Sequence, residues 1–290
     1  MEKTEKTTQT KPEFIPLRND ILFHMVFTRN KAALKSLLSV LLALPEQEIR
    51  EIEVLNPVQH SERIDTKQTV LDLKVHLNGD RFILVEMQVR RFQHWTNRIL
   101  VYACRQVAEQ VHDEFKYHAL EPVIQISIMN YSLFRDHPRF FAKYLLRDEE
   151  GYLYSDRLQL YVMDLTQIEN ATEEQRVQGL TEWANVFHAN SWEEMDRIEN
   201  TGVKEAAKTM KFILADPTER DLLQWKMDAL NDWNNMLYSE HEEGLQEGLQ
   251  RGQIQAFAGL VRDGILTASA AAQRAGLTEA EFISKAEELA

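Results

Sequence analysis

The chain has 290 residues, 44% of them hydrophobic, which is enough for a sizeable core and one or two domains. A single cysteine, Cys104, excludes an internal disulfide framework and argues against a thiolate zinc site. The formal net charge of −13 arises in the second half of the chain, because residues 1–159 carry 22 Lys and Arg against 22 Asp and Glu. The overall acidity therefore leaves room for an anion-binding surface in the first half.

The first twelve residues are polar, small and charged, without the apolar segment of a secretory signal. They predict a disordered tail. Along the rest of the chain, no apolar run approaches membrane-spanning length. Together with the reducing environment that one cysteine favours, these features predict a cytoplasmic protein with no membrane partner.

Two helices are predicted ahead of the first strand. Asn19-Asp20 is a helix-cap signal before the apolar stretch ILFHMVF, and residues 31–44 carry an apolar face that Pro45 ends. A short strand follows at residues 51–58. Asp20 is by default part of the cap, and a functional role would require its carboxylate to project toward the hairpin described next.

Residues 70–89, VLDLKVHLNGDRFILVEMQV, predict a β-hairpin around Asn78-Gly79. Because side chains alternate across a strand, the parity of a residue number decides its face. The odd positions carry the apolar side chains Leu71, Leu73, Val75, Leu77, Ile83, Val85, Met87 and Val89. The even positions carry the polar side chains Asp72, Lys74, His76, Glu86 and Gln88. One face of the hairpin is therefore predicted to be buried in the core.

Parity also predicts the register of the hairpin. A two-residue Asn78-Gly79 loop would pair residues whose numbers sum to 157, and each face would then be half apolar. An even sum keeps the faces separate and needs a loop such as a three-residue turn with a bulge. With a sum of 158, Asp72 lies opposite Glu86, and with 156 it lies one step diagonal to it.

Either even register crowds Asp72, Glu86 and Gln88 on one face, with Lys74 beside them. Close like charges need a compensating cation, which predicts a divalent-metal site. A solvated, charged sheet face is the other interpretation. Spacing alone leaves both open.

A long helix is predicted after the hairpin, from an i+4 apolar stripe formed by Trp95, Ile99, Ala103, Val107, Val111 and Phe115. Arg91, Arg98 and Arg105 recur every seven residues on another face, and Tyr102 lies one turn from Arg98. Beside two carboxylates such a stripe could hold phosphates. The alternative is a solvated face that pairs with nearby acids such as Glu109.

Residues 122–129 and 158–165 predict two further strands, and the aromatic-rich connection between them is predicted to cover one sheet edge. A long helical region follows from about residue 172 to 241. No Gly-rich phosphate loop is present, since both the G-x-x-x-x-G-K-[ST] pattern and a strand-linked G-x-G-x-x-G are missing from the sequence.

The last fifty residues hold a glycine stripe, Gly244, Gly248 and Gly252, in a helical context where each glycine costs about 1 kcal/mol relative to alanine. Two interpretations of this stripe remain open: a close approach of two helices at a dimer interface, or a pliable connector. Two short helices divided at Gly276-Leu277 follow. They carry few basic side chains, which favours a role in packing or oligomerisation over sequence-specific DNA recognition.

The segments NDILFHMVF, VLDLKV and VEMQV, with Arg98 and Tyr102 as R-x-x-x-Y and then PVIQISIM and LYVMDL, come in a characteristic order. As a set, they resemble the PD-(D/E)XK nuclease superfamily. More narrowly, the chain looks like its Rpn branch of recombination-promoting nucleases, also called PD-(D/E)XK transposase-like proteins. The resemblance covers residues 13–170 well, and it extends loosely to the glycine repeats of the tail.

This resemblance implies an α/β fold with a restriction-endonuclease-like core, in which helices flank a mixed central sheet, and an α-helical C-terminal region. The domain organisation expected is a tail at 1–12, a nuclease-like domain at 13–170, a helical region at 171–240, and a glycine-repeat helix with a helical hairpin at 241–290.

The resemblance also implies a Mg²⁺- or Mn²⁺-dependent endonuclease that acts on double-stranded DNA in recombination or transposition. Carried over onto this sequence, Asp72, Glu86 and the Met87 carbonyl would bind the metal, with Asp20 as a further ligand. Gln88 stands where the superfamily usually has a lysine, although the Rpn branch shows glutamine there too.

Because glutamine is neutral, it can orient a water but cannot offset charge. Lys74, on the same face, is our hypothesis for the missing charge. Residues expected to hold the DNA backbone are Arg91, Arg98, Tyr102 and Arg105.

Two other functions remain in view: a non-catalytic DNA-binding protein on the same fold, and an assembly protein that forms a homo-oligomer through its C-terminal helices. Plasmid cleavage, DNA binding without cleavage, and loss of an oligomer on tail deletion would distinguish the three.

Overall fold

The computed structural model describes residues 12–55, 58–59, 69–70, 72–91, 93–111 and 116–289. The chain divides into two compact units, Met1–Leu223 and Gln224–Ala290, and each is described by itself. None of the helices formed by the described residues combines the length and the apolar character needed to cross a membrane.

The first unit is built on a six-stranded mixed sheet. In spatial order its strands are β1 (Ile52–Val54), β4 (Leu73–Leu77), β5 (Arg81–Gln88), β6 (Val123–Met129), β8 (Leu153–Asp164) and β7 (Phe141–Arg147). β5, β6 and β8 run parallel, and the other neighbours are antiparallel. A separate two-stranded sheet pairs β2 (Val58–Gln59) with β3 (Thr69–Val70).

Helices make up most of the remainder. The α-helices are α1 (Asp20–Arg29), α2 (Lys31–Leu42), α3 (Trp95–Glu109), α4 (Glu173–Val177), α5 (Leu180–His188), α6 (Trp192–Asp196), α7 (Thr201–Ala215), α8 (Pro217–Arg262), α9 (Ala268–Ala275) and α10 (Glu279–Glu288). Short 3-10 segments lie at Glu46–Glu48, Tyr117–Ala119 and Leu165–Asn170.

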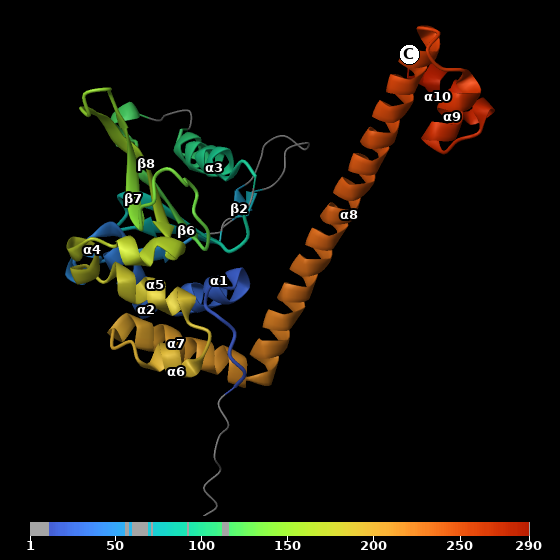
Figure 1. The fold of residues 1–290 in the computed structure, drawn as a ribbon. Coiled ribbons are helices and arrows are strands. Elements are labelled where there is room, and N and C mark those ends of the chain that lie inside the picture. The colour runs from blue at the N-terminus through green and yellow to red at the C-terminus, as the bar shows by residue number, and fades with distance from the viewer. Residues whose placement is uncertain are drawn as a thin grey trace, which may run out of the picture. The chain divides into compact units, whose positions relative to one another are not determined.

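Helices cover both faces of the main sheet. Figure 1 shows α3 on one side and α1, α2 and α5 on the other. α3 packs against β6 and β8, while α1 contacts β4 and β5. This is the mixed sheet flanked by helices, followed by C-terminal helices, that the sequence predicts.

The register of the β4–β5 hairpin confirms the parity argument. Leu73 pairs with Val85 and Leu77 with Arg81, so paired numbers sum to 158. A three-residue turn joins the strands, with Asn78 at φ 55° and Gly79 at φ 68°. Both residues adopt the left-handed conformation that Asn and Gly tolerate best. The pure apolar face therefore depends on the turn length.

The first strand of the hairpin is shorter than the sequence predicts. Asp72 lies in a bend just ahead of β4, and residues 69–70 pair with β2 instead of continuing the ladder. The predicted strand at 51–58 is likewise divided, into β1 and β2. Asp72 thus sits at the end of a strand, where its carboxylate can turn toward neighbouring elements.

Two other elements differ from expectation. The predicted long helix ends at Glu109, so Val111 lies beyond it, and Phe115 is outside the described residues. The aromatic-rich connection before residue 158 forms β7 and the first part of β8. It extends the sheet by an antiparallel strand instead of covering its edge.

The local helix signals are confirmed. The Asn19 side chain accepts a hydrogen bond from the Leu22 amide at 3.0 Å and caps α1. Thr278 forms a capping box with Glu281 at the start of α10, two residues after Gly276 at φ 69°. Of the predicted disordered tail, residues 1–11 lie outside the part of the chain that the structure describes.

Within the first unit, the helical region that follows the sheet packs against α2 through α7. A Cβ added at Gly202 of α7 would lie 2.1 Å from the Ser36 Cβ of α2, so glycine permits this close approach. In the second unit, by contrast, a Cβ at Gly244, Gly248 or Gly252 would meet open space. A small core around Ile254 and Phe282 joins α8 to α9 and α10.

Candidate active site

Asp72 and Glu86 come together where β4 begins and β5 approaches its end. The Met87 amide donates a hydrogen bond of 2.6 Å to Asp72 Oδ2, which fixes this carboxylate against β5. Extending the hairpin register places Asp72 opposite Glu86. Glu86 is only 3% exposed, and its Oε1 has no hydrogen-bond partner among the described residues.

Asp20 approaches the same place from α1. It is the first residue of the helix, directly after the Asn19 cap, and it is half-buried. One turn later, His24 Nδ1 lies 2.6 Å from the Asp72 carbonyl and donates to it. This hydrogen bond anchors α1 to the backbone of Asp72. Our sequence interpretation missed His24, although its i+4 spacing from Asp20 places both on one helix face.

The pKa values of the three carboxyl groups reflect this crowding. Burial is the main cause that raises the pKa of Asp20 to about 6. Burial also raises the pKa of Asp72, and the charge of Asp20 raises it further. The pKa of Glu86 is raised well above its ordinary value, first by burial and then by Asp72. The three groups thus form one acidic cluster in a poorly solvated place.

Arg98 of α3 opposes these shifts. Its charge lowers the pKa of Asp20, of Asp72 and of Glu86. Its Nε donates a 2.5 Å hydrogen bond to the Tyr102 hydroxyl, and its guanidinium carbon lies 5.5 Å from the Trp95 ring centre and 5.1 Å from that of Tyr102. The charge of Arg90, a residue that we did not predict to belong to the site, also lowers the pKa of Asp20.

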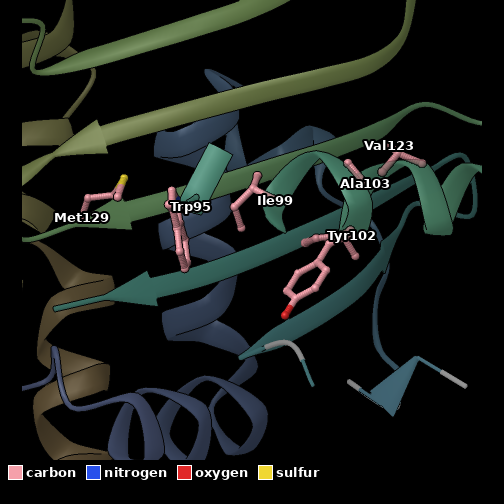
Figure 2. Close-up of a cluster of buried hydrophobic side chains, with 7 residues drawn as sticks. Trp95, Ile99, Tyr102, Ala103, Val123 and Met129 are labelled. Atoms are coloured by element: carbon pink, nitrogen blue, oxygen red, sulfur yellow. The ribbon is translucent and has the colours of Figure 1, made fainter. Parts of the chain in front are cut away.

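α3 holds these groups over the sheet. Trp95, Ile99, Tyr102 and Ala103 project from the helix toward β5 and β6, as Figure 2 shows. They pack with Leu84, which lies two residues before Glu86 on the same face of β5. The aromatic side chains beneath Arg98 therefore rest on the face that carries Glu86.

The other predicted site residues have different partners. Gln88 Nε2 donates a 2.6 Å hydrogen bond to the Arg90 carbonyl. Lys74 Nζ lies 3.0 Å from Glu109 Oε2, so this buried lysine joins β4 to the last residue of α3. Arg91 is exposed just beyond β5, and Arg105 is half-buried two turns after Arg98.

Several buried polar atoms lie between α3 and the sheet without a hydrogen-bond partner among the described residues. They are Glu86 Oε1, Trp95 Nε1, Gln106 Oε1 and both amide atoms of Gln125. Gln125 and Ser127 of β6 lie beside Leu84 and Glu86 of β5 in the parallel ladder. A polar layer therefore runs beneath α3 next to the acidic cluster.

The donor set fits a hard divalent cation. Carboxylate oxygens are the ligands that Mg²⁺ and Mn²⁺ prefer, and Glu86 Oε1 is a buried acceptor without a partner in the described part of the chain. Within the same residues, no three His, Cys, Asp or Glu side chains are grouped as a ready-made ligand set. Mg²⁺ commonly uses one or two carboxylates and keeps several waters, which two acids and a backbone carbonyl would satisfy.

The mixed sheet with flanking helices and a carboxylate-bearing hairpin defines a PD-(D/E)XK-like α/β protein. A family model described as PD-(D/E)XK nuclease family transposase matches residues 17–240, and the chain belongs to this family. The match includes the whole main sheet, helices α1 to α7 and the first part of α8. No curated protein and no solved structure matches the chain. The family resemblance and the fold class predicted from sequence are both confirmed.

Proposed function

We propose that this nuclease-family protein is a divalent-metal-dependent endonuclease that hydrolyses phosphodiester bonds of double-stranded DNA during recombination or transposition. The observation that carries the proposal is the Asp72–Glu86 pair, held opposite across the hairpin with Asp72 fixed by the Met87 amide. The proposal includes a cytoplasmic location.

In this proposal, Asp72, Glu86 and the Met87 carbonyl hold Mg²⁺ or Mn²⁺, with Asp20 as a further ligand. The cation would supply Lewis-acid activation of a phosphate oxygen and of a water. Gln88 orients that water through a hydrogen bond, because its amide can donate and accept. Arg91, Arg105 and Tyr102 hold the flanking DNA backbone, which gives weak sequence preference.

The experiment is nicking of supercoiled plasmid by the full chain with Mg²⁺ or Mn²⁺. Asp72→Ala and Glu86→Ala should each lose at least about 100-fold in rate, since each removes a ligand of the charge-stabilising centre. Asp80→Ala is the matched control, because Asp80 lies in the hairpin turn, where it pairs with Arg81. Undiminished cleavage by both folded site variants would exclude this site.

Metal binding supplies a second readout that does not depend on activity. At about 100 times its dissociation constant, a bound ion stabilises the folded protein by about 2.7 kcal/mol. Mn²⁺ should therefore raise the unfolding temperature of the wild type and of Asp80→Ala, but not of Glu86→Ala.

DNA binding without cleavage is the second candidate. The observation that favours it is the low exposure of Glu86 beneath α3, together with a neutral Gln88 in the lysine position. This function predicts a DNA mobility shift by the wild type with no cleavage product in Mg²⁺, Mn²⁺ or Co²⁺.

A further inference from the structure

We propose that Arg98 is the cation of the catalytic site: its guanidinium contacts the scissile phosphate and takes the role that a lysine at the Gln88 position has in related sites. The inference rests on the proposed function and deepens it. It moves Arg98 from the flanking DNA backbone, where the sequence interpretation put it, to the reacting phosphate.

Gln88 cannot carry a charge, and its side chain already has a partner. The amide donates to the Arg90 carbonyl at 2.6 Å, just beyond the end of β5. This leaves the glutamine able to orient a neighbour by hydrogen bonding, but the positive charge must come from another residue.

Lys74 shares the hairpin face with Glu86, but its ammonium group binds Glu109 at 3.0 Å. Glu109 is the last residue of α3, eleven residues beyond Arg98, or about 16 Å along the helix at about 1.5 Å per residue. The charge of Lys74 is therefore compensated at the other end of the helix from Arg98.

Arg98 is mounted at the end of α3 that lies over the acidic cluster. Trp95 and Tyr102, whose rings lie under its guanidinium, are 2% and 9% exposed, and both pack in the cluster that contains Leu84 of β5. The hydrogen bond from Nε to the Tyr102 hydroxyl fixes the direction of the guanidinium group. Tyr102 is thus a positioning residue for Arg98.

The electrostatic effect of Arg98 agrees with this placement, since it lowers the pKa of all three carboxyl groups. Arg81, the first residue of β5, lies 2.6 Å from Asp80 in the hairpin turn and is not among the described groups that act on the three acids. Arg98 and Arg81 therefore make a matched pair of arginines for experiment.

In the proposed step, the water oxygen forms a bond to phosphorus while the bond from phosphorus to the leaving oxygen breaks. The attacking water loses a proton to solvent, and the leaving oxygen receives one from solvent. Arg98 keeps its protons and donates hydrogen bonds to the phosphate oxygens as their negative charge grows. Its planar guanidinium suits two phosphate oxygens at once.

Before DNA binds, the same guanidinium offsets the charge of Asp20, Asp72 and Glu86. Arg98 therefore opposes metal binding electrostatically and promotes cleavage once the site is loaded. This double effect distinguishes it from a residue that only maintains the fold, because loss of the arginine should strengthen metal binding while weakening catalysis.

The test measures the Mn²⁺ dissociation constant by calorimetry and the single-turnover cleavage rate at saturating Mn²⁺, for the full chain and its Arg98→Met and Arg81→Met variants. Arg98→Met should bind Mn²⁺ at least about threefold more tightly, because one opposing charge is gone. Its rate should fall about 100-fold, the loss expected for one charge-stabilising donor. Arg81→Met should remain within about threefold of the wild type in both, because its guanidinium pairs with Asp80 in the hairpin turn.

Two further variants keep the inference testable if Arg98→Met folds poorly. Arg98→Lys retains the charge but lacks the planar fork, so it should keep the wild-type Mn²⁺ affinity and lose about tenfold in rate. Adding Gln88→Lys to Arg98→Met should restore at least about tenfold of the lost rate by returning a cation to the strand.

Unchanged or weaker Mn²⁺ binding by Arg98→Met, or a cleavage rate within about threefold of the wild type, would overturn the assignment. If Arg98→Met does not fold, an Arg98→Lys rate equal to the wild-type rate overturns it. A wild type that cuts DNA while Arg98 variants are unaffected refutes this inference alone. A wild type that cuts with no divalent ion refutes the proposed function and this inference together.

Discussion

On one face of the β4–β5 hairpin, Leu73, Val75, Ile83, Val85 and Met87 are each at most 1% exposed, and every one is apolar. On the other face, the buried positions beneath α3 include Lys74 at 9% and Glu86 at 3% exposure and, on the adjoining strand, Gln125 and Ser127. The same two strands thus separate a face that stabilises the fold from a face that carries ionisable groups.

The polar face carries an energetic cost that the apolar face does not. A buried polar atom without a partner costs roughly 1–3 kcal/mol, and a buried carboxylate beside another costs more unless a cation compensates it. Five of the six such atoms found in the described residues belong to Glu86, Trp95, Gln106 and Gln125. We infer that this face gives up stability for function, a common trade-off at active sites.

The largest effect on stability should follow from a cavity made in the apolar face. Ile83→Ala removes a fully buried side chain and should lower the free energy of unfolding by about 2–5 kcal/mol, as measured by urea denaturation. Glu86 lies on the opposite face of the hairpin, so the cleavage rate per folded molecule should be retained. Leu245→Ala, at a half-exposed position in the second unit, should change stability by less than about 0.5 kcal/mol.

A second, smaller effect should follow from the removal of one charge from the polar face. Asp72→Asn keeps an acceptor for the Met87 amide but removes a charge whose folded-state pKa is raised. Without divalent ions it should stabilise the protein by about 1–2 kcal/mol at pH 8.

The pH dependence of this gain has a definite sign. A raised pKa means that the folded state holds the proton more tightly, so the wild type loses stability as pH rises from the ordinary aspartate range through the folded-state pKa. The advantage of Asp72→Asn should shrink as pH falls toward about 4. Asp80→Asn should have the opposite sign, a small loss at pH 8, because Arg81 lowers the pKa of Asp80. A gain that grows as pH falls would contradict the buried-charge explanation.

The smallest effect tests Lys74. Lys74→Met breaks a partly buried ion pair and should cost about 1 kcal/mol in the free energy of unfolding, with a similar loss in Glu109→Gln. If Lys74 joins β4 to α3, the plasmid cleavage rate should change less than about threefold. A loss of about 100-fold in Lys74→Met alone would instead support our sequence-based hypothesis that Lys74 supplies the catalytic charge.

Sequence reasoning predicted the features that depend on nearest neighbours along the chain. Alternation alone fixed an even register, and the observed three-residue turn at Asn78-Gly79 satisfies it. The Asn19 cap, the α3 stripe and the break at Gly276 are likewise local patterns. The family resemblance rested on short segments in order, and the family match confirms it.

Features that depend on tertiary contacts could not be predicted. Lys74 finds Glu109 thirty-five residues away, although the sequence places it nearer to Asp72. His24 looks like an ordinary helix residue until α1 docks beside Asp72. The β7 strand was missed because its alternation becomes meaningful only when β8 lies beside it.

The order in which the chain can assemble follows from the turn of the hairpin. Closing a three-residue loop costs little chain entropy, and isolated hairpins form within about 1–10 μs. Asp72 and Glu86, fourteen residues apart, therefore meet through the most local pairing of the sheet. Arg98 reaches them only after α3 has formed and docked. We expect a growing chain to assemble its two acids first and to carry their repulsion until the helix arrives, so that divalent ions present during refolding should speed the docking of α3.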